Sequence, residues 1–163
     1  QIKSEHFRGK VCRTLNMDAA KNEYVITGNY SYTALLIEHR SNKKLIQMVI
    51  DNFAENLSGE WQIFILHSKN SESDFRSVAE KHNISNRIKL FQPTFFDTGK
   101  KFSHLDYNAL FFNPDFYEKY IPTETFLIFQ MDTLINPKGK HLLKSFLSYD
   151  YVGAPWSKFT FLC

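Results

Sequence analysis

The chain has 163 residues, of which 43% are hydrophobic and 23% charged, and its formal net charge is +3. This length and composition are typical of one globular domain with a buried core, and they exclude a disordered or collagen-like chain. The basic residues are scattered rather than concentrated, which argues against a nucleic-acid partner, and no apolar run approaches the roughly 18 residues of a membrane span.

The amino-terminal part divides into an extension and the start of a domain. Residues 1–32 are polar and weakly periodic, and we expect them to form an extension of a domain over residues 33–163. The continuous apolar run at residues 33–38 predicts a strand buried on both faces. Apolar residues at helical spacing follow, and they predict a helix that Ser41 or Asn42 caps.

The next segments continue the alternation of strand and helix. Residues 61–66 are apolar and predict a second strand, residues 73–82 an amphipathic helix, and residues 87–91 a shorter third strand. A helix is predicted over about residues 103–112. Asn113-Pro114 interrupts this helix, and we expect residues 115–120 to form another turn.

The most informative strand is predicted at residues 125–130, a short apolar run that reads as a buried strand. Gln130 and Asp132 stand at its carboxyl end, where open α/β sheets bind their ligands. Alternation along a strand would direct both side chains the same way. Alternatively, Asp132 only caps the segment that follows. The strand pattern leaves both interpretations open.

The predicted elements together indicate one α/β domain. Residues 139–149 have helical spacing, and residues 150–156 predict a strand or an extended loop. Strands that alternate with helices predict a parallel sheet joined by right-handed crossovers. Its ligand-binding edge would be shared by residues 38–40, 67–70 and 130–132.

Several common catalytic motifs are absent from the sequence. It contains no GxxxxGK[ST], GxGxxG or GxSxG motif, which argues against a P-loop NTPase, a dinucleotide oxidoreductase and the commonest serine hydrolase. A strand that ends in one carboxylate suits Mg²⁺ or Mn²⁺ when a diphosphate supplies further oxygens. Cys12 and Cys163 lack metal-ligand spacing, so we expect a reducing compartment and a cytoplasmic location.

Three motifs in the sequence resemble those of a known family. They are Tyr107-Asn108 with a Leu-Phe-Phe run, Gln130-x-Asp132-Thr133, and a Tyr-Asp-Tyr-Val-Gly-Ala-Pro-Trp segment that starts at Tyr149. Their order and spacing resemble a family of glycosyltransferase-like proteins, known largely as a domain of unknown function, with members in large DNA viruses, fungi and bacteria. The resemblance covers most of the chain, and the combination of motifs is more specific than any one of them.

The resemblance implies a Rossmann-like GT-A fold with a mostly parallel sheet in the order 3-2-1-4 and helices on both faces. It implies a glycosyltransferase that uses a nucleoside-diphosphate sugar, by analogy a UDP-sugar, with Mn²⁺ or Mg²⁺. The acceptor would be a glycan, a protein or a small molecule. In that strand order, the first and fourth strands are neighbours, and Arg40 and Asp132 flank one crevice.

The resemblance also implies roles for individual residues. Asp132 would bind the metal and act in catalysis, and Gln130 would contact the ribose or the water shell of the metal. The other residues expected at the donor are Glu38, His39, Arg40, Tyr107 and Asn108. Arg40 could instead pair with Glu38. Asp150 is a candidate acceptor-side base, or part of a structural turn.

The family pattern continues beyond Trp156 with a half that binds the acceptor, whereas only residues 157–163 follow here. The sequence is therefore interpreted as a truncated or naturally short member. The alternative function is a catalytically inactive GT-A-like domain that acts as a binding or interaction module.

Overall fold

The computed structural model of the chain describes residues 29–82, 87–96 and 102–153. Its strands and helices are β1 (Tyr32–Glu38), α1 (Lys43–Asn56), β2 (Trp61–His67), η1 (Lys69–Ser71), α2 (Glu72–Lys81), β3 (Ile88–Phe91), η2 (Thr94–Phe96), α3 (His104–Phe111), α4 (Pro114–Tyr120), β4 (Thr125–Phe129), η3 (Lys140–Leu142) and α5 (Leu143–Phe146). Residues 1–28 of the predicted extension and residues 154–156 of the predicted final segment lie outside the described residues.

Four parallel strands form the sheet, in the order β3-β2-β1-β4. β1 pairs with β2 along its whole length, from Tyr32 opposite Trp61 to Glu38 opposite His67. On its other side β1 pairs with β4, as far as Leu36 opposite Phe129. The predicted α/β class and the strand order 3-2-1-4 are confirmed, and the fold is Rossmann-like.

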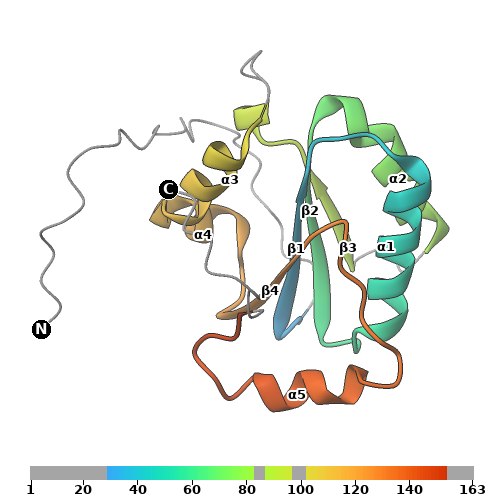
Figure 1. The fold of residues 1–163 in the computed structure, drawn as a ribbon, viewed down its shortest axis with the longest axis vertical. Helices are drawn as coiled ribbons and strands as arrows, with labels where there is room; N and C mark the ends of the chain where they lie inside the picture. Colours follow the sequence, from blue (N-terminus) through green and yellow to red (C-terminus); the bar gives the residue numbers. More distant parts are fainter. Residues whose placement is uncertain (1–28, 83–86, 97–101, 154–163) are drawn as a thin grey trace, which may run out of the picture.

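Helices cover both faces of this sheet (Figure 1). The helices α1 and α2 lie on one face, and α3 and α4 lie on the other. Alternate residues of β1 enter the two cores: Ala34 and Leu36 join the core with α1 and α2, whereas Leu35 and Ile37 join the core with α3 and α4. A strand covered on both faces needs the continuous apolar run that the sequence contains.

The helix ends explain one correct prediction and one wrong one. Asn42 caps α1 as predicted, because its side-chain oxygen accepts a hydrogen bond from the Leu45 N–H at 3.2 Å. The turn predicted for residues 115–120 is wrong, because these residues form the helix α4. Asn113 caps α4, and Pro114 occupies its first turn, where proline starts a helix rather than breaking one.

The strand β4 is only half-buried, so the prediction of a fully buried strand is wrong. Phe129 is buried, but Ile128 is 37% exposed. Among the described strands, β4 pairs with β1 alone and forms an edge of the sheet. An apolar groove of about 290 Å³ lies beside it, between β4, the residues that follow it and α5.

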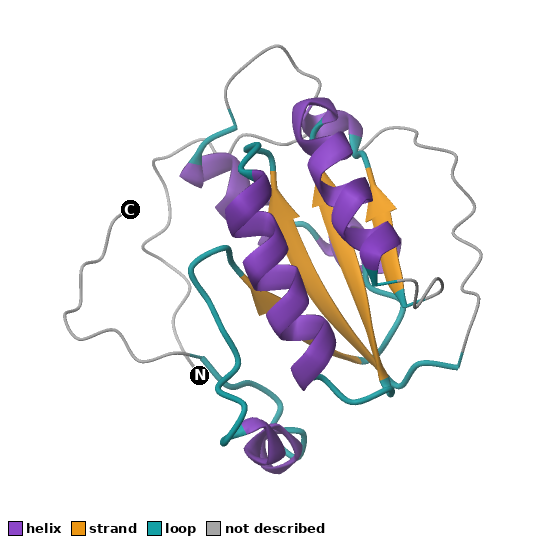
Figure 2. Cartoon of the chain, turned by 90° about the vertical axis from the view of Figure 1, so that its right-hand side faces the viewer, coloured by secondary structure: helices purple, strands orange, loops and turns teal. Residues whose placement is uncertain are grey.

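The helix predicted over residues 139–149 is shorter in the structure, where η3 and α5 cover Lys140–Phe146. In both ribbon views α5 lies at the amino ends of the strands, opposite the arrowheads (Figures 1 and 2). None of the helices in the described ranges is long and apolar enough to cross a membrane.

Candidate functional site

The candidate site lies where β1 and β4 end side by side. Leu36 stands opposite Phe129 in the parallel register, so the residues that follow each strand leave the sheet at the same end, the carboxyl end of the strands. The chain proceeds from β1 to β2 and β3 and then returns to β4 on the other side of β1. Such a switch point is where open parallel sheets bind their ligands.

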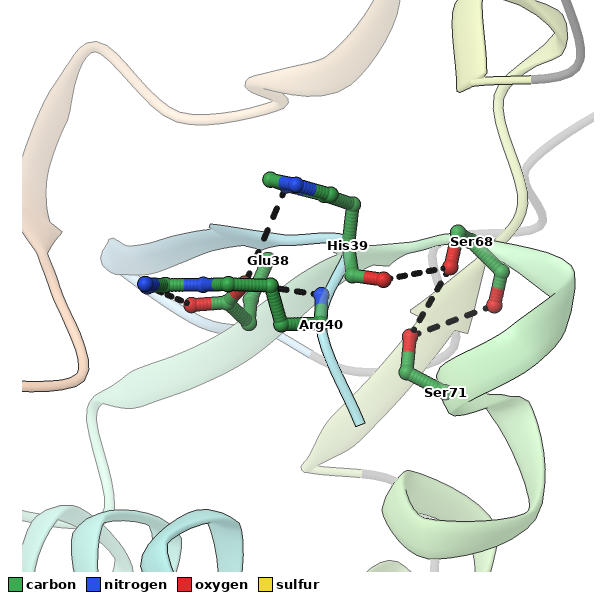
Figure 3. A network of polar contacts seen from close by, with 5 residues as sticks. All are labelled: Glu38, His39, Arg40, Ser68 and Ser71. Atoms are coloured by element: carbon green, nitrogen blue, oxygen red, sulfur yellow. Dashed lines mark hydrogen bonds and ion pairs between the residues drawn. The ribbon is translucent and has the colours of Figure 1, made fainter. Parts of the chain in front are cut away.

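Glu38 and Arg40 form a bidentate ion pair at the end of β1 (Figure 3). The Arg40 Nε donates to Glu38 Oε1 at 2.9 Å, and Nη2 donates to Oε2 at 2.7 Å. The Arg40 backbone N–H also donates to Oε1, at 2.8 Å. The pair that the sequence left open is therefore formed, and both Glu38 oxygens have partners.

The two partners differ in exposure. The Glu38 side chain is 6% exposed and the Arg40 side chain 71% exposed. Burial would raise the pKa of Glu38, but the hydrogen bonds and the charge of Arg40 outweigh burial and hold that pKa below its usual range. Arg40 is thus fixed by a buried carboxylate while most of its side chain is exposed to solvent, where it can meet an anion.

The backbone of the same triplet is held by the end of β2. Ser68 Oγ donates to the His39 carbonyl at 2.7 Å, and Ser71 Oγ donates to the Ser68 carbonyl at 3.2 Å (Figure 3). The His39 ring lies 5.6 Å from Phe102 and 6.2 Å from Phe96, between centroids. His39 therefore packs within the aromatic cluster at this edge.

At the end of β4 the chain turns, and the strand stops at Phe129, one residue earlier than predicted. The Thr133 N–H donates to the Gln130 carbonyl at 3.1 Å and closes the turn. Met131 is buried at the centre of this turn, whereas Gln130 and Asp132 are exposed on either side of it. The turn thus anchors itself through Met131 and presents an amide and a carboxylate.

Electrostatic interactions join the two strand ends. The hydrogen bonds and charge of Glu38 raise the pKa of Arg40, and the charge of Asp132 adds to that effect. Gln130 Nε2 donates to the Tyr107 hydroxyl at 3.3 Å. Burial raises the pKa of Tyr107, the hydrogen bond from Gln130 opposes this, and the charges of Glu38 and Asp132 raise it further.

Six of the predicted site residues lie close together, because His39 Nδ1 is also 3.8 Å from Glu38 Oε1 (Figure 3). Five of them link the two strand ends through hydrogen bonds and electrostatic interactions: Glu38, Arg40, Tyr107, Gln130 and Asp132. We call this set the β1–β4 group. Asn108 is exposed on α3 beside Tyr107, and among the described residues no hydrogen bond or ion pair joins its side chain to the group.

Asp150 does not join the β1–β4 group through any contact of the described residues. It is exposed and follows α5, which lies at the opposite end of the sheet (Figure 2). His67, which the sequence placed on the same edge as residues 38–40, is buried and contacts the Ser68 carbonyl through Nδ1 at 3.1 Å. Its contacts are those of a structural histidine.

The sequence interpretation missed Ser71 and Asn52, which support the site from a distance. Ser71 could have been suspected because it follows the end of the second predicted strand by a few residues. Asn52 carries no sequence signal, because it lies inside α1 and contacts Ile135, 83 residues away. Only the fold brings Asn52 and Ile135 together.

The donor atoms of the β1–β4 group fit a metal bound mainly by a ligand. The described residues contain no cluster of three or more His, Cys, Asp or Glu side chains that could hold a metal by itself. Asp132 is exposed, whereas Glu38 already uses both oxygens on Arg40. One carboxylate with a neighbouring amide oxygen suits Mg²⁺ or Mn²⁺ when phosphates and water complete the coordination.

Comparisons with known proteins give one match. A family described as "Protein of unknown function (DUF5672)" matches residues 86–161, which include α3, β4 and the Gln130–Asp132 turn. The match begins after β1 and α1, and its description assigns no activity. No curated protein and no solved structure matches the chain.

Proposed function

We propose that the β1–β4 group binds a nucleoside-diphosphate sugar, with a UDP-sugar as the first candidate, and that the chain contributes to transfer of the sugar to an acceptor. The observation that carries this proposal is the adjacency of β1 and β4, which sets the cation Arg40 and the anion Asp132 on one edge of the sheet. A cation together with a carboxylate that can hold Mg²⁺ or Mn²⁺ suits the binding of a diphosphate.

Each residue of the group has a role in this proposal. Asp132 and the side-chain oxygen of Gln130 would hold Mn²⁺ or Mg²⁺, and the cation would neutralise charge on the diphosphate. Arg40 keeps an exposed guanidinium edge for a phosphate, because Glu38 fixes the other edge. Tyr107, half-buried and hydrogen-bonded to Gln130, borders the donor on the side of α3.

The proposed transfer breaks the bond between the anomeric carbon and the diphosphate oxygen, and the electron pair stays on the diphosphate. The acceptor oxygen forms the new bond to that carbon and gives up its proton to a base. The β1–β4 group would stabilise the diphosphate leaving group, on which negative charge develops. Asp150, the sequence-based candidate for the base on the acceptor side, follows α5 at the opposite end of the sheet and therefore does not stand beside this group (Figure 2).

A second candidate is a binding module without transfer activity. It is favoured by the carboxylates of the β1–β4 group: Glu38 is engaged by Arg40, so Asp132 alone would have to serve the metal. A single free carboxylate is sufficient for binding a metal–diphosphate complex but provides no additional base for the acceptor.

Calorimetric titration of UDP, with and without Mn²⁺, tests the donor site. The wild-type chain is expected to bind UDP in a metal-dependent manner, and Asp132→Asn to lose that dependence. Glu124→Gln is the matched control, because Glu124 is an exposed carboxylate at the opposite, amino end of β4. A folded wild-type chain that binds neither UDP nor GDP contradicts the proposal, and so does equal binding by Asp132→Asn.

Binding of UDP without turnover would favour the second candidate. Hydrolysis of a UDP-sugar to UDP and free sugar gives a readout that needs no acceptor other than water. A rate that depends on Mn²⁺ and on Asp132 supports the transferase, whereas saturable donor binding with no release of sugar supports the binding module.

A further inference from the structure

The turn that carries Asp132 is held at both ends by adjacent residues of one helix. The turn follows β4 directly and continues to Ile135, and α1 packs against the same core. On the preceding side, the Phe129 ring stacks on the Phe53 ring with centroids 3.8 Å apart and an interplanar angle of 18°. Met131 is buried in this core as well.

The second anchor is a pair of hydrogen bonds between a side chain and the backbone. The Ile135 N–H donates to Asn52 Oδ1 at 2.7 Å, and Asn52 Nδ2 donates to the Ile135 carbonyl at 3.0 Å. The amide of Asn52 thus satisfies both backbone groups of one residue, much as a partner strand would. Both residues are half-buried, so water competes weakly for these groups.

The two anchors leave the intervening residues little freedom. Phe129 and Ile135 are each fixed to α1, and Asp132 stands between them in a closed turn. The same helix begins at Lys43, three residues after Arg40. A single rigid element therefore ties the end of β1 to the turn after β4.

We propose that Asn52 is a positioning residue for Asp132: it holds the turn after β4 in place at the carboxyl end of the sheet, beside the end of β1 that carries Arg40. Asn52 acts through the backbone of Ile135 rather than by contacting a ligand. Its effect on donor binding rests on the proposed function, whereas its effect on the turn does not.

The test compares two amides on the same helix. Asn52→Leu removes both hydrogen bonds to Ile135 while keeping a side chain of similar size. Asn56→Leu is the matched control, because Asn56 is also half-buried and lies one turn further along α1, but its amide donates to the Asn52 carbonyl at 2.8 Å within the helix. Asn52→Asp is a milder variant that keeps the acceptor for the Ile135 N–H and loses the donor to the Ile135 carbonyl.

The first readout is amide hydrogen exchange measured by NMR on the whole chain. Asn52→Leu is expected to reduce the protection of the Ile135 amide roughly tenfold and to shift the amide signals of the turn from Met131 to Thr133. Asn52→Asp is expected to keep that protection, and Asn56→Leu to leave the turn unchanged. An unaltered turn in Asn52→Leu, or an equal change in Asn56→Leu, overturns the proposal.

The second readout is the affinity for UDP in the presence of Mn²⁺. Residues that orient a metal ligand typically cost about 10-fold to 100-fold in affinity when replaced, and Asn52→Leu is expected to fall in that range. Asn56→Leu is expected to bind as the wild type does. An Asn52→Leu variant with a displaced turn and wild-type affinity overturns the positioning role.

The two readouts separate this proposal from the proposed function. If the wild type binds no UDP, the proposed function fails, and the exchange experiment still decides whether Asn52 holds the turn. If the wild type binds UDP and Asn52→Leu changes neither readout, the positioning role fails and the donor site stands.

Discussion

Replacement of Arg87 by methionine tests how the fold holds the carboxyl end of α1. Arg87 is 7% exposed and precedes β3. Its guanidinium donates four hydrogen bonds to backbone carbonyls, from Nε to Trp61 at 2.8 Å, from Nη1 to Ala54 at 3.0 Å, and from Nη2 to Leu57 at 2.8 Å and Ser58 at 2.7 Å.

The expected loss of stability follows from the hydrogen bonds that those four carbonyls would lose. Ala54 lies in the last turn of α1, whose carbonyls have no partner within the helix, and Leu57 and Ser58 directly follow that helix. A cation there also faces the negative end of the helix dipole. Four hydrogen bonds at about 1 to 1.5 kcal/mol each sum to about 5 kcal/mol. Burial of the guanidinium lowers the pKa of Arg87 and offsets part of this sum. We expect Arg87→Met to reduce the free energy of unfolding by about 3 kcal/mol.

Urea unfolding followed by circular dichroism measures this change. For a slope near 2 kcal/mol per molar urea, the expected loss lowers the midpoint by about 1.5 M. Arg76→Met is the control, because Arg76 is exposed and pairs only with Glu72 on the same helix among the described residues. Arg87→Lys is expected to be intermediate, since a lysine keeps the charge but not the planar set of donors. Equal midpoints for Arg87→Met and Arg76→Met would refute this reasoning.

Two further predictions concern stability. The pKa of Glu38 is lowered in the folded chain, because the hydrogen bonds from Arg40 outweigh burial. Glu38 therefore stabilises the fold above its unfolded pKa of about 4.3. This contribution is lost as the pH falls through the folded pKa. Glu38→Gln should therefore flatten the pH dependence of urea unfolding between about pH 5 and pH 3, and an unchanged slope would contradict the pair. Ser103 and Asp106 form a capping box at the start of α3, so Ser103→Ala should cost about 1 kcal/mol in thermal unfolding, and an unchanged midpoint would exclude a contribution from the cap.

The elements that the sequence predicted well are those whose signal is local. The uninterrupted apolar run of β1 indicates burial on both faces, and the cap at Asn42 with the apolar period after it locates α1. The strand order could not come from these patterns alone. It was predicted through the family resemblance, and the sheet confirms it.

The incorrect predictions depend on context that local patterns do not contain. The helix α3 ends before Asn113-Pro114 as predicted, but the same pair also starts α4 where only a turn was predicted, because proline without an N–H is tolerated in a first turn. The apolar run of β4 was taken as fully buried, but β4 is the edge of the described sheet and leaves Ile128 exposed. Burial of a strand depends on its neighbours as well as on its composition.

The candidate site was predicted in part. Arg40 and Asp132 were expected to flank one crevice, and the structure places both at the carboxyl ends of neighbouring strands, where the charge of Asp132 helps to raise the pKa of Arg40. Neither the ion pair that fixes Arg40 nor the Asn52 amide that holds Ile135 could be read with certainty from the sequence. The first was one of two open alternatives, and the second joins residues 83 positions apart.

Paramagnetic broadening of amide signals by Mn²⁺, in the isotopically labelled chain with UDP present, tests the central claim most directly. Bound Mn²⁺ broadens the amides closest to it, so the result locates the metal as well as detecting it. We predict that broadening is strongest at Asp132 and Thr133, reaches Arg40, requires UDP and disappears in Asp132→Asn. Broadening centred elsewhere in the chain, or unchanged in Asp132→Asn, would contradict a donor site at the β1–β4 edge.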